Sequence, residues 1–261
     1  MNGITAWMEK YLVPVAAKIG SQKHLVALRD SFIGMLPATL AGALAAMISA
    51  IVTTFPSAIQ QMMLGATAFS KLAPEKVWTL ANTPIIGDLN NISALVNQGT
   101  LTVIGLIFAF SWGYNLARAY GVNDLAGGIV SVATLFAGLP NQMGKFTAAL
   151  GTGKAGVAAT DKLNGVLGDQ GLAAWKPLFA SAHLDAGAYF TVIIMGALAV
   201  IIYAKLMLAD ITIKMPESVP PAVAKAFLAI IPTIAALYIV GLIYYIIGKL
   251  TNDSVINLIT H

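Results

Sequence analysis

The sequence predicts an all-α membrane protein: a polytopic bundle of five or six transmembrane helices, preceded by an amphipathic helix at the N-terminus. Of its 261 residues, 58% are apolar and only 10% are charged. Soluble domains usually carry about 25% charged residues, so this chain lacks the polar surface that covers a water-soluble protein. Long stretches of the sequence also contain no charged residue. This is the pattern of membrane spans, because an ionisable side chain at the bilayer centre costs about 2.5–3.5 kcal/mol.

Residues 1–30 form the first predicted unit, an amphipathic helix that lies in the membrane interface. A cleaved signal peptide is the alternative, but Glu9 and Lys10 interrupt the apolar stretch and no cleavage-type segment follows. The apolar residues recur at helical spacing; they are Ile4, Trp7, Met8, Tyr11, Leu12, Val15 and Ile19.

Five charge-free runs follow, covering residues 31–70, 89–117, 125–144, 186–204 and 226–248. Each can supply the roughly 20 helical residues that cross a bilayer. The first run is too long for one span, and Pro56 is predicted to end its helix near residue 55, leaving 57–70 as an interfacial or re-entrant piece. We expect residues 31–204 to form a scaffold and dimerisation bundle. Its hydrophilic excursion, 145–185, lacks the full phosphate-loop spacing that nucleotide binding would require.

Small residues are spaced four apart in two of the predicted spans. Such stripes let helix backbones approach closely, and in lipid close packing replaces the hydrophobic effect as the source of association. The contact can lie within one subunit or between two, and the spacing does not choose between them. The stripes are Ala38, Gly42, Ala46 and Ala50 in the first span, and Gly105, Ala109, Gly113 and Ala117 in the second.

His183 and Asp185 stand just ahead of the fourth run and are the candidate substrate-binding residues of this chain. Polar groups at a membrane entrance can bind sugar hydroxyls or move protons. The alternative is that His183 and Asp185 only form the start of a helix, since Asp is a preferred N-cap. Trp112 and Tyr114 could stack on a sugar, although aromatic residues at a membrane boundary are commonly belt residues.

Residues 205–225 are predicted to be a stiff, cationic and cytoplasmic linker, marked by Lys214, Pro216, Pro220 and Pro221. Proline cannot continue a helix, so the fourth span must end here and a new helix should begin near Pro221. Residues 226–261 are then the start of the next transmembrane unit. The excess of Lys and Arg over short loops favours a cytoplasmic N-terminus.

Several classes of function are disfavoured by composition. The 15 Lys and Arg residues are scattered singly, which is not the footprint of a nucleic-acid-binding protein. The chain has no cysteine, and none of its three histidines, His24, His183 and His261, belongs to a helical i,i+4 pair, so we expect no metal site and no cofactor. The spans hold no acidic or basic side chain for acid–base work, and we expect no catalytic residue.

The linker and the N-terminus together resemble one known family. Residues 213–223, followed by Phe227 and Ile231-Pro232, are similar to the linker of the lactose/cellobiose/diacetylchitobiose family of enzyme IIC, the membrane permease of the bacterial sugar phosphotransferase system. Residues 7–10, 23–25 and 27–33, leading to Leu36-Pro37, resemble its first helix.

The resemblance implies a homodimeric, multi-pass permease of the bacterial plasma membrane that carries a β-linked disaccharide such as cellobiose, lactose or diacetylchitobiose. A IIB partner, supplied with phosphate by IIA, would phosphorylate the sugar, so the phosphotransfer chemistry lies on those partners.

The family's main sugar ligands belong to motifs that do not occur in these residues, and the resemblance places them beyond His261. His261 itself is not a candidate for the family's ligand histidine, because its neighbours Ile259 and Thr260 do not match that motif. We therefore interpret the chain as the N-terminal scaffold part of such a permease. The alternative is a transport-inactive membrane protein that dimerises or caps a permease.

Overall fold

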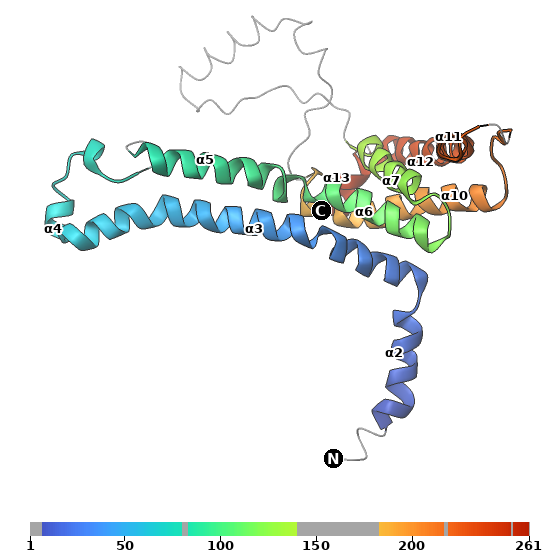
Figure 1. The fold of residues 1–261 in the computed structure, drawn as a ribbon, viewed down its shortest axis with the longest axis horizontal. Helices are drawn as coiled ribbons and strands as arrows, with labels where there is room; N and C mark the ends of the chain where they lie inside the picture. Colours follow the sequence, from blue (N-terminus) through green and yellow to red (C-terminus); the bar gives the residue numbers. More distant parts are fainter. Residues whose placement is uncertain (1–6, 80–82, 140–182, 217–218, 252, 261) are drawn as a thin grey trace, which may run out of the picture.

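The computed structural model describes residues 7–79, 83–139, 183–216, 219–251 and 253–260, and every regular element in these ranges is helical. The predicted all-α fold is confirmed. Figure 1 shows a long hairpin of α3 (Lys23–Leu64) and α5 (Pro84–Gln98) extending from a bundle. The bundle is built from α6 (Ile104–Ala119), α7 (Asp124–Ala137), α10 (Ala197–Leu208) and α12 (Ile230–Thr251).

The N-terminal helix consists of a π-helical turn, Met8–Leu12, and α2 (Val13–Gly20). It points away from the bundle in Figure 1. Its apolar side chains Trp7, Tyr11, Leu12, Val15 and Ile19 are exposed, as they would be in a helix that rests on a membrane surface. The next helix begins at Lys23, so residues 23–30, which we predicted to belong to the amphipathic unit, are part of α3.

The prediction that Pro56 ends the first span is wrong. Helix α3 runs for 42 residues to Leu64 with Pro37 and Pro56 inside it, and Figure 1 shows it as one bowed helix. A proline removes one backbone hydrogen bond and bends a helix, and in apolar helices this local loss is tolerated when neighbouring contacts hold the chain. The helix ends at Gly65, whose φ of 77° most other residues rarely adopt.

The far end of the α3–α5 hairpin is closed by Gln60, which is buried although it is polar. Its Nε2 donates to the Lys76 carbonyl at 2.8 Å, and its Oε1 accepts from the Trp78 N–H at 2.8 Å. The connection also contains α4 (Ala66–Phe69) and a 3₁₀ turn, Pro74–Lys76. One amide side chain therefore satisfies two backbone groups of the turn.

Helix α3 is fastened to α6 by polar side chains where the hairpin meets the bundle. Ser111 Oγ donates to the Ser31 carbonyl at 3.0 Å. Ser31 Oγ lies 2.6 Å from the Ala27 carbonyl of its own helix and 3.2 Å from the Ser111 carbonyl, so its one proton is shared between the two acceptors. Asn115 Nδ2 lies 3.3 Å from Ser31 Oγ across the two helices, and it donates to the Ser111 carbonyl of its own helix at 2.9 Å. These contacts hold the backbones of α3 and α6 close together.

Four described helical segments are long and apolar enough to cross a membrane, whereas we predicted five or six. They are Lys23–Leu64, Pro84–Ala119, Ala186–Leu208 and Val223–Thr251. The predicted span 125–144 appears as the 14-residue helix α7. Residues 140–144, and the expected excursion 145–185 apart from its last three residues, lie outside the described ranges.

The core of the bundle lies where α6 meets α7, α10 and the π-helical turn Val192–Gly196. Phe108 and Leu116 of α6 are completely buried there, as are Val200 and Tyr203 of α10. Trp112 is only 3% exposed. Both roles that we considered for this residue, a membrane-boundary belt and a sugar platform, are therefore wrong, because its ring is enclosed by neighbouring helices.

The C-terminal part returns along the bundle. Helix α10 ends at Leu208, and α11 (Pro221–Leu228) begins at the proline where we predicted a new helix. Only residues 209–216 and 219–220 of the described linker are non-helical, so the predicted linker 205–225 is helical at both ends. Helix α12 follows, and the short α13 (Val255–Thr260) packs back against α9 (Tyr189–Thr191).

Candidate functional site

His183 joins two parts of the chain that are far apart in sequence. Its Nε2 lies 3.2 Å from Oδ1 of Asn257 on α13. The Asn257 amide nitrogen donates to Asp253 Oδ1 at 2.8 Å, which leaves its oxygen to face the imidazole. The proton of neutral His183 is thereby assigned to Nε2. The other ring nitrogen, Nδ1, is buried and has no hydrogen-bond partner among the described residues.

Asp185 organises the start of the same segment. Its carboxylate accepts from the Gly187 N–H at 2.7 Å, as an N-cap does. The preceding carbonyl, that of Leu184, accepts from the Gly105 N–H at 2.7 Å. The residues from His183 to Asp185 therefore lie against the beginning of α6 through the Leu184 carbonyl and against α13 through His183.

Gly105 permits that close approach. A Cβ atom at this position would lie 2.4 Å from the Asp185 carbonyl oxygen and 2.8 Å from that of Leu184. Any larger residue would push the His183 segment away from α6. The described residues thus bring the two candidate substrate-binding side chains together at one end of the bundle, where they contact polar groups of the chain itself. Binding of a substrate by them stays a prediction.

The sequence analysis excluded His261 as the family's ligand histidine. His261 lies outside the described residues. The described part of the chain ends at Thr260, the last residue of α13. The exclusion of His261 from the candidate site therefore stays a prediction, as does the expectation that the main sugar ligands lie beyond it.

The predicted small-residue stripes differ in their surroundings. Gly42 is buried, and a Cβ there would lie 2.4 Å from Thr100 Oγ1, while its stripe neighbours Ala38 and Ala46 are half-buried. In the second stripe Ala109 is completely buried, and a Cβ on Gly113 would lie 2.3 Å from the Gly127 carbonyl oxygen of α7. The structure places these glycines against helices of the same chain, and a subunit interface stays a prediction.

One residue of the predicted linker motif, Lys214, forms an ion pair with Asp210. Asp210 has a φ of 58°, and the Lys214 ammonium pairs with its carboxylate. Both side chains are exposed. Hydrogen bonding from Lys214 holds the pKa of Asp210 below its usual value. Pro216 and Pro220 are not buried, and Pro221 opens α11.

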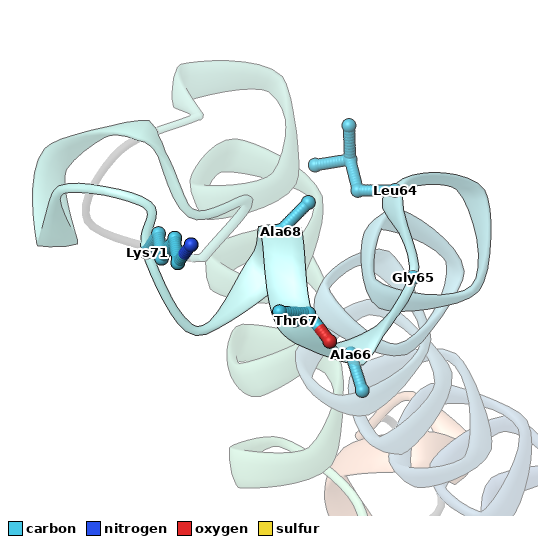
Figure 2. A pocket seen from close by; sticks show the side chains of 6 residues that line it. All are labelled: Leu64, Gly65, Ala66, Thr67, Ala68 and Lys71. Atoms are coloured by element: carbon cyan, nitrogen blue, oxygen red, sulfur yellow. The ribbon is translucent and has the colours of Figure 1, made fainter.

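The surface of the described part of the chain includes two hollows that could hold a ligand. One, of about 420 Å³, is at the tip of the hairpin (Figure 2). It is open and is lined chiefly by the short turn from Leu64 to Ala68, with Lys71 beside it. The second, of about 410 Å³, is an apolar groove between α7 and the α11–α12 segment. Among the described residues, no group of three or more His, Asp or Glu side chains could hold a metal ion.

Sequence reasoning missed the residues that fasten these parts together. Gln60, Ser111 and Asn257 lie in mainly apolar stretches, and their partners are 16 to 80 residues away. For Gln60 and Ser111 the signal was a polar side chain within a candidate span, because a polar side chain in lipid needs a partner; Asn257 lies outside the spans and gave no such signal.

The chain was compared with known protein families. Residues 29–261 match the family model described as "Phosphotransferase system, EIIC". The chain belongs to the EIIC family. The similarity to known EIIC proteins extends over nearly the full length of this chain. It is 26% identical to the lichenan permease IIC component of Bacillus subtilis (strain 168) over 260 residues, which cover 100% of this chain and 49% of that protein.

Two further comparisons give the same result. The cellobiose-specific EIIC component of Geobacillus stearothermophilus is 26% identical over 260 residues, covering 100% of this chain and 49% of the relative. The crystal structure of the transporter ChbC, the IIC component from the N,N'-diacetylchitobiose-specific phosphotransferase system, superposes with a TM-score of 0.68 at 24% identity, covering 97% of this chain and 49% of that one. This EIIC chain therefore has the ChbC fold over about half the length of the relatives it matches.

Proposed function

We propose that this chain is the scaffold part of an EIIC permease that carries a β-linked disaccharide across the bacterial plasma membrane. The observation that carries the proposal is the family match over residues 29–261, together with relatives named for cellobiose, lichenan and oligo-β-mannoside. These relatives are all named as permease or EIIC components, which favours a permease over a transport-inactive interaction protein.

The partners follow from the same family. A IIB protein, charged by IIA, would phosphorylate the sugar, and a second copy of the chain would complete a homodimer within the lipid. In alternating access the packed helices α3, α6 and α7 would stay fixed, while a sugar-binding part moves relative to them. The contact between Ser31 and Ser111 supports this rigid role, because the Ser111 hydroxyl donates to the Ser31 carbonyl of α3 and the buried Ser31 hydroxyl lies within 3.2 Å of the Ser111 carbonyl of α6.

The test is uptake of radiolabelled cellobiose by cells that lack their own carrier. We expect no uptake when the 261-residue chain is expressed alone, and uptake when it is joined to the part of a cellobiose EIIC that carries the family's sugar-ligand motifs. Uptake by the chain alone would refute the scaffold role. Equal failure of both, with both proteins present in the membrane, would count against the permease proposal itself.

The N-terminus is proposed to lie in the cytoplasm. His24 at the start of α3 contacts the Tyr120 hydroxyl after α6 at 3.2 Å, and the Tyr203 hydroxyl of α10 donates to the Asn123 carbonyl at 3.3 Å. One end of the bundle, on the right in Figure 1, therefore gathers the start of α3, the α6–α7 turn and the linker. This end carries Lys23, Arg118, Lys205 and Lys225, as the cytoplasmic side of membrane proteins commonly does.

Orientation can be measured by thiol labelling, because the native chain has no cysteine. A Lys214→Cys variant should react with an impermeant maleimide only after the cells are permeabilised. A Ser70→Cys variant, at the opposite end of α3, should react in intact cells. The reverse pattern would place the N-terminus outside.

A further inference from the structure

The short helix α13 depends on the bundle for its stability. It has six residues, and a helix of that length does not form alone in water. Its apolar residues Val255 and Ile256 are buried, and it packs against α9 and the 3₁₀ turn Ala186–Ala188. A hydrogen bond adds to this packing, because Asn257 Oδ1 faces His183 Nε2 at 3.2 Å.

The side chain of Asn257 is held in one orientation. Asp253 Oδ1 accepts from Asn257 Nδ2 at 2.8 Å and from the Ser254 N–H at 2.7 Å. The Asn257 N–H lies 3.3 Å from Ser254 Oγ, which accepts from it. Because the amide nitrogen is bound to a carboxylate, the amide presents its oxygen to the imidazole. The contact therefore requires an N–H on Nε2 of His183, in the neutral as in the charged ring.

The second ring nitrogen of His183 distinguishes the two protonation states. In the neutral ring Nδ1 carries a lone pair, and this atom is buried without a hydrogen-bond partner among the described residues. Protonation places an N–H on Nδ1, where the docked geometry offers it no acceptor. A charged donor without an acceptor costs more to bury than a neutral nitrogen. The docked position of α13 therefore fits the neutral imidazole and not the imidazolium.

The titratable groups around His183 do not supply the missing acceptor in this position. Asp185 Oδ1 accepts from the Gly187 N–H at 2.7 Å, and Asp253 Oδ1 holds Asn257 and Ser254. Residues 101–112, which include the start of α6, contain no titratable side chain. The two carboxylates attract an imidazolium, but its Nδ1–H reaches them or water only after the ring has moved. The other titratable side chains on the described helices α9 and α12 are Tyr189, Tyr238, Tyr244, Tyr245 and Lys249.

We propose that His183 is a pH-sensitive latch for α13. Neutral His183 holds the helix against the bundle through Asn257, and protonated His183 releases it. Docking is complete at about pH 8 and weakens as the pH falls to about 5, the range in which histidine changes its charge. His183 lies at the start of α6, opposite the linker end (Figure 1), and this end faces outward in the orientation proposed above. The response to the pH outside the cell rests on that orientation, whereas the latch itself does not.

The experiment is hydrogen exchange of the purified 261-residue chain in detergent at about pH 8 and about pH 5, with each rate compared with its intrinsic rate at that pH. Protection of the α13 amides should fall about tenfold on acidification, the effect of one buried donor without an acceptor. The α6 amides from Phe108 to Leu116, two completely buried residues, should stay protected and serve as the internal reference. Unchanged protection of α13, or an equal loss in α6, would overturn the proposal.

Matched variants identify the titrating group. The His183→Gln side chain can donate an N–H to Asn257 Oδ1 but takes up no proton, so α13 should stay protected at both pH values. His24→Gln makes the same change near the linker end and should keep the native pH dependence. His183→Ala removes the donor and should leave α13 weakly protected at both pH values. If His183→Gln loses protection on acidification as the native chain does, or His183→Ala stays fully protected, the proposal fails. No sugar and no membrane are present, so the outcome is independent of the transport and orientation proposals.

Discussion

Adding a single methyl group at Gly113 should force α6 and α7 apart. In the structure a Cβ on Gly113 would lie 2.3 Å from the Gly127 carbonyl oxygen and 2.5 Å from Ser131 Cβ. Ordinary van der Waals contacts of a Cβ begin at 3.4 Å, so the helices must separate by about 1 Å. The obstacles are backbone and a Cβ atom, which cannot rotate away as the end of a side chain can.

Overpacking of a well-packed core costs typically 1–3 kcal/mol, and these rigid neighbours place Gly113→Ala at the upper end, about 3 kcal/mol. For a protein of this size that loss lowers the melting temperature by about 6–12 °C. Gly241→Ala is the matched control, because it is also a glycine within a long apolar helix and a Cβ there has nothing within 4 Å. That variant should be neutral or stabilised by about 0.5–1 kcal/mol, since alanine favours the helix.

The assay is thermal unfolding of both variants in the same detergent, followed by intrinsic tryptophan fluorescence. If Gly113→Ala melts at the same temperature as Gly241→Ala, the α6–α7 contact is not as tight as the distances require and the argument is refuted.

Gln60→Ala should leave two backbone groups of the hairpin turn without partners, at about 1–3 kcal/mol, and hydrogen exchange at residues 76–78 should accelerate while the exposed neighbour variant Gln61→Ala leaves it unchanged. Lys214→Gln should raise the pKa of Asp210 toward its usual value, measured by carboxyl chemical shifts. In the native chain this ion pair persists above the ordinary aspartate pKa and is lost as the pH falls through the depressed one. Protection of the linker amides, relative to their intrinsic exchange rates, should then fall, and protection that does not change with acidification would contradict this. Ser111→Ala should cost about 1 kcal/mol in the melting assay by removing the hydrogen bond from Ser111 Oγ to the Ser31 carbonyl of α3, and an unchanged melting temperature would argue against that bond.

Local features of the fold could be predicted from sequence because they depend on neighbouring residues. Pro221 begins a helix in the structure, as its fixed φ and missing N–H require. Asp185 accepts a backbone N–H as a helix-start residue does. The apolar runs identified the candidate spans, because the cost of burying charge in lipid is large and local.

Features that depend on the rest of the fold could not be predicted. The effect of Pro56 is decided by contacts along the whole of α3, so a rule about one proline placed the helix end nine residues too early. Whether Trp112 faces lipid or the core depends on how α7 and Gly196 pack against it. The bond between His183 and Asn257 joins residues 74 positions apart, and no local pattern records it.

The two hydrogen bonds of the Gln60 side chain have a consequence for where the end of the long hairpin can lie. At 42 residues, α3 is about 63 Å long, twice the thickness of a hydrocarbon core of about 30 Å. An irregular turn is normally kept out of the acyl region, because each bare amide or carbonyl group there costs several kcal/mol. By occupying the Lys76 carbonyl and the Trp78 N–H, this one glutamine lowers that penalty, so an inclined hairpin can rest its tip against the membrane instead of having to reach into open water.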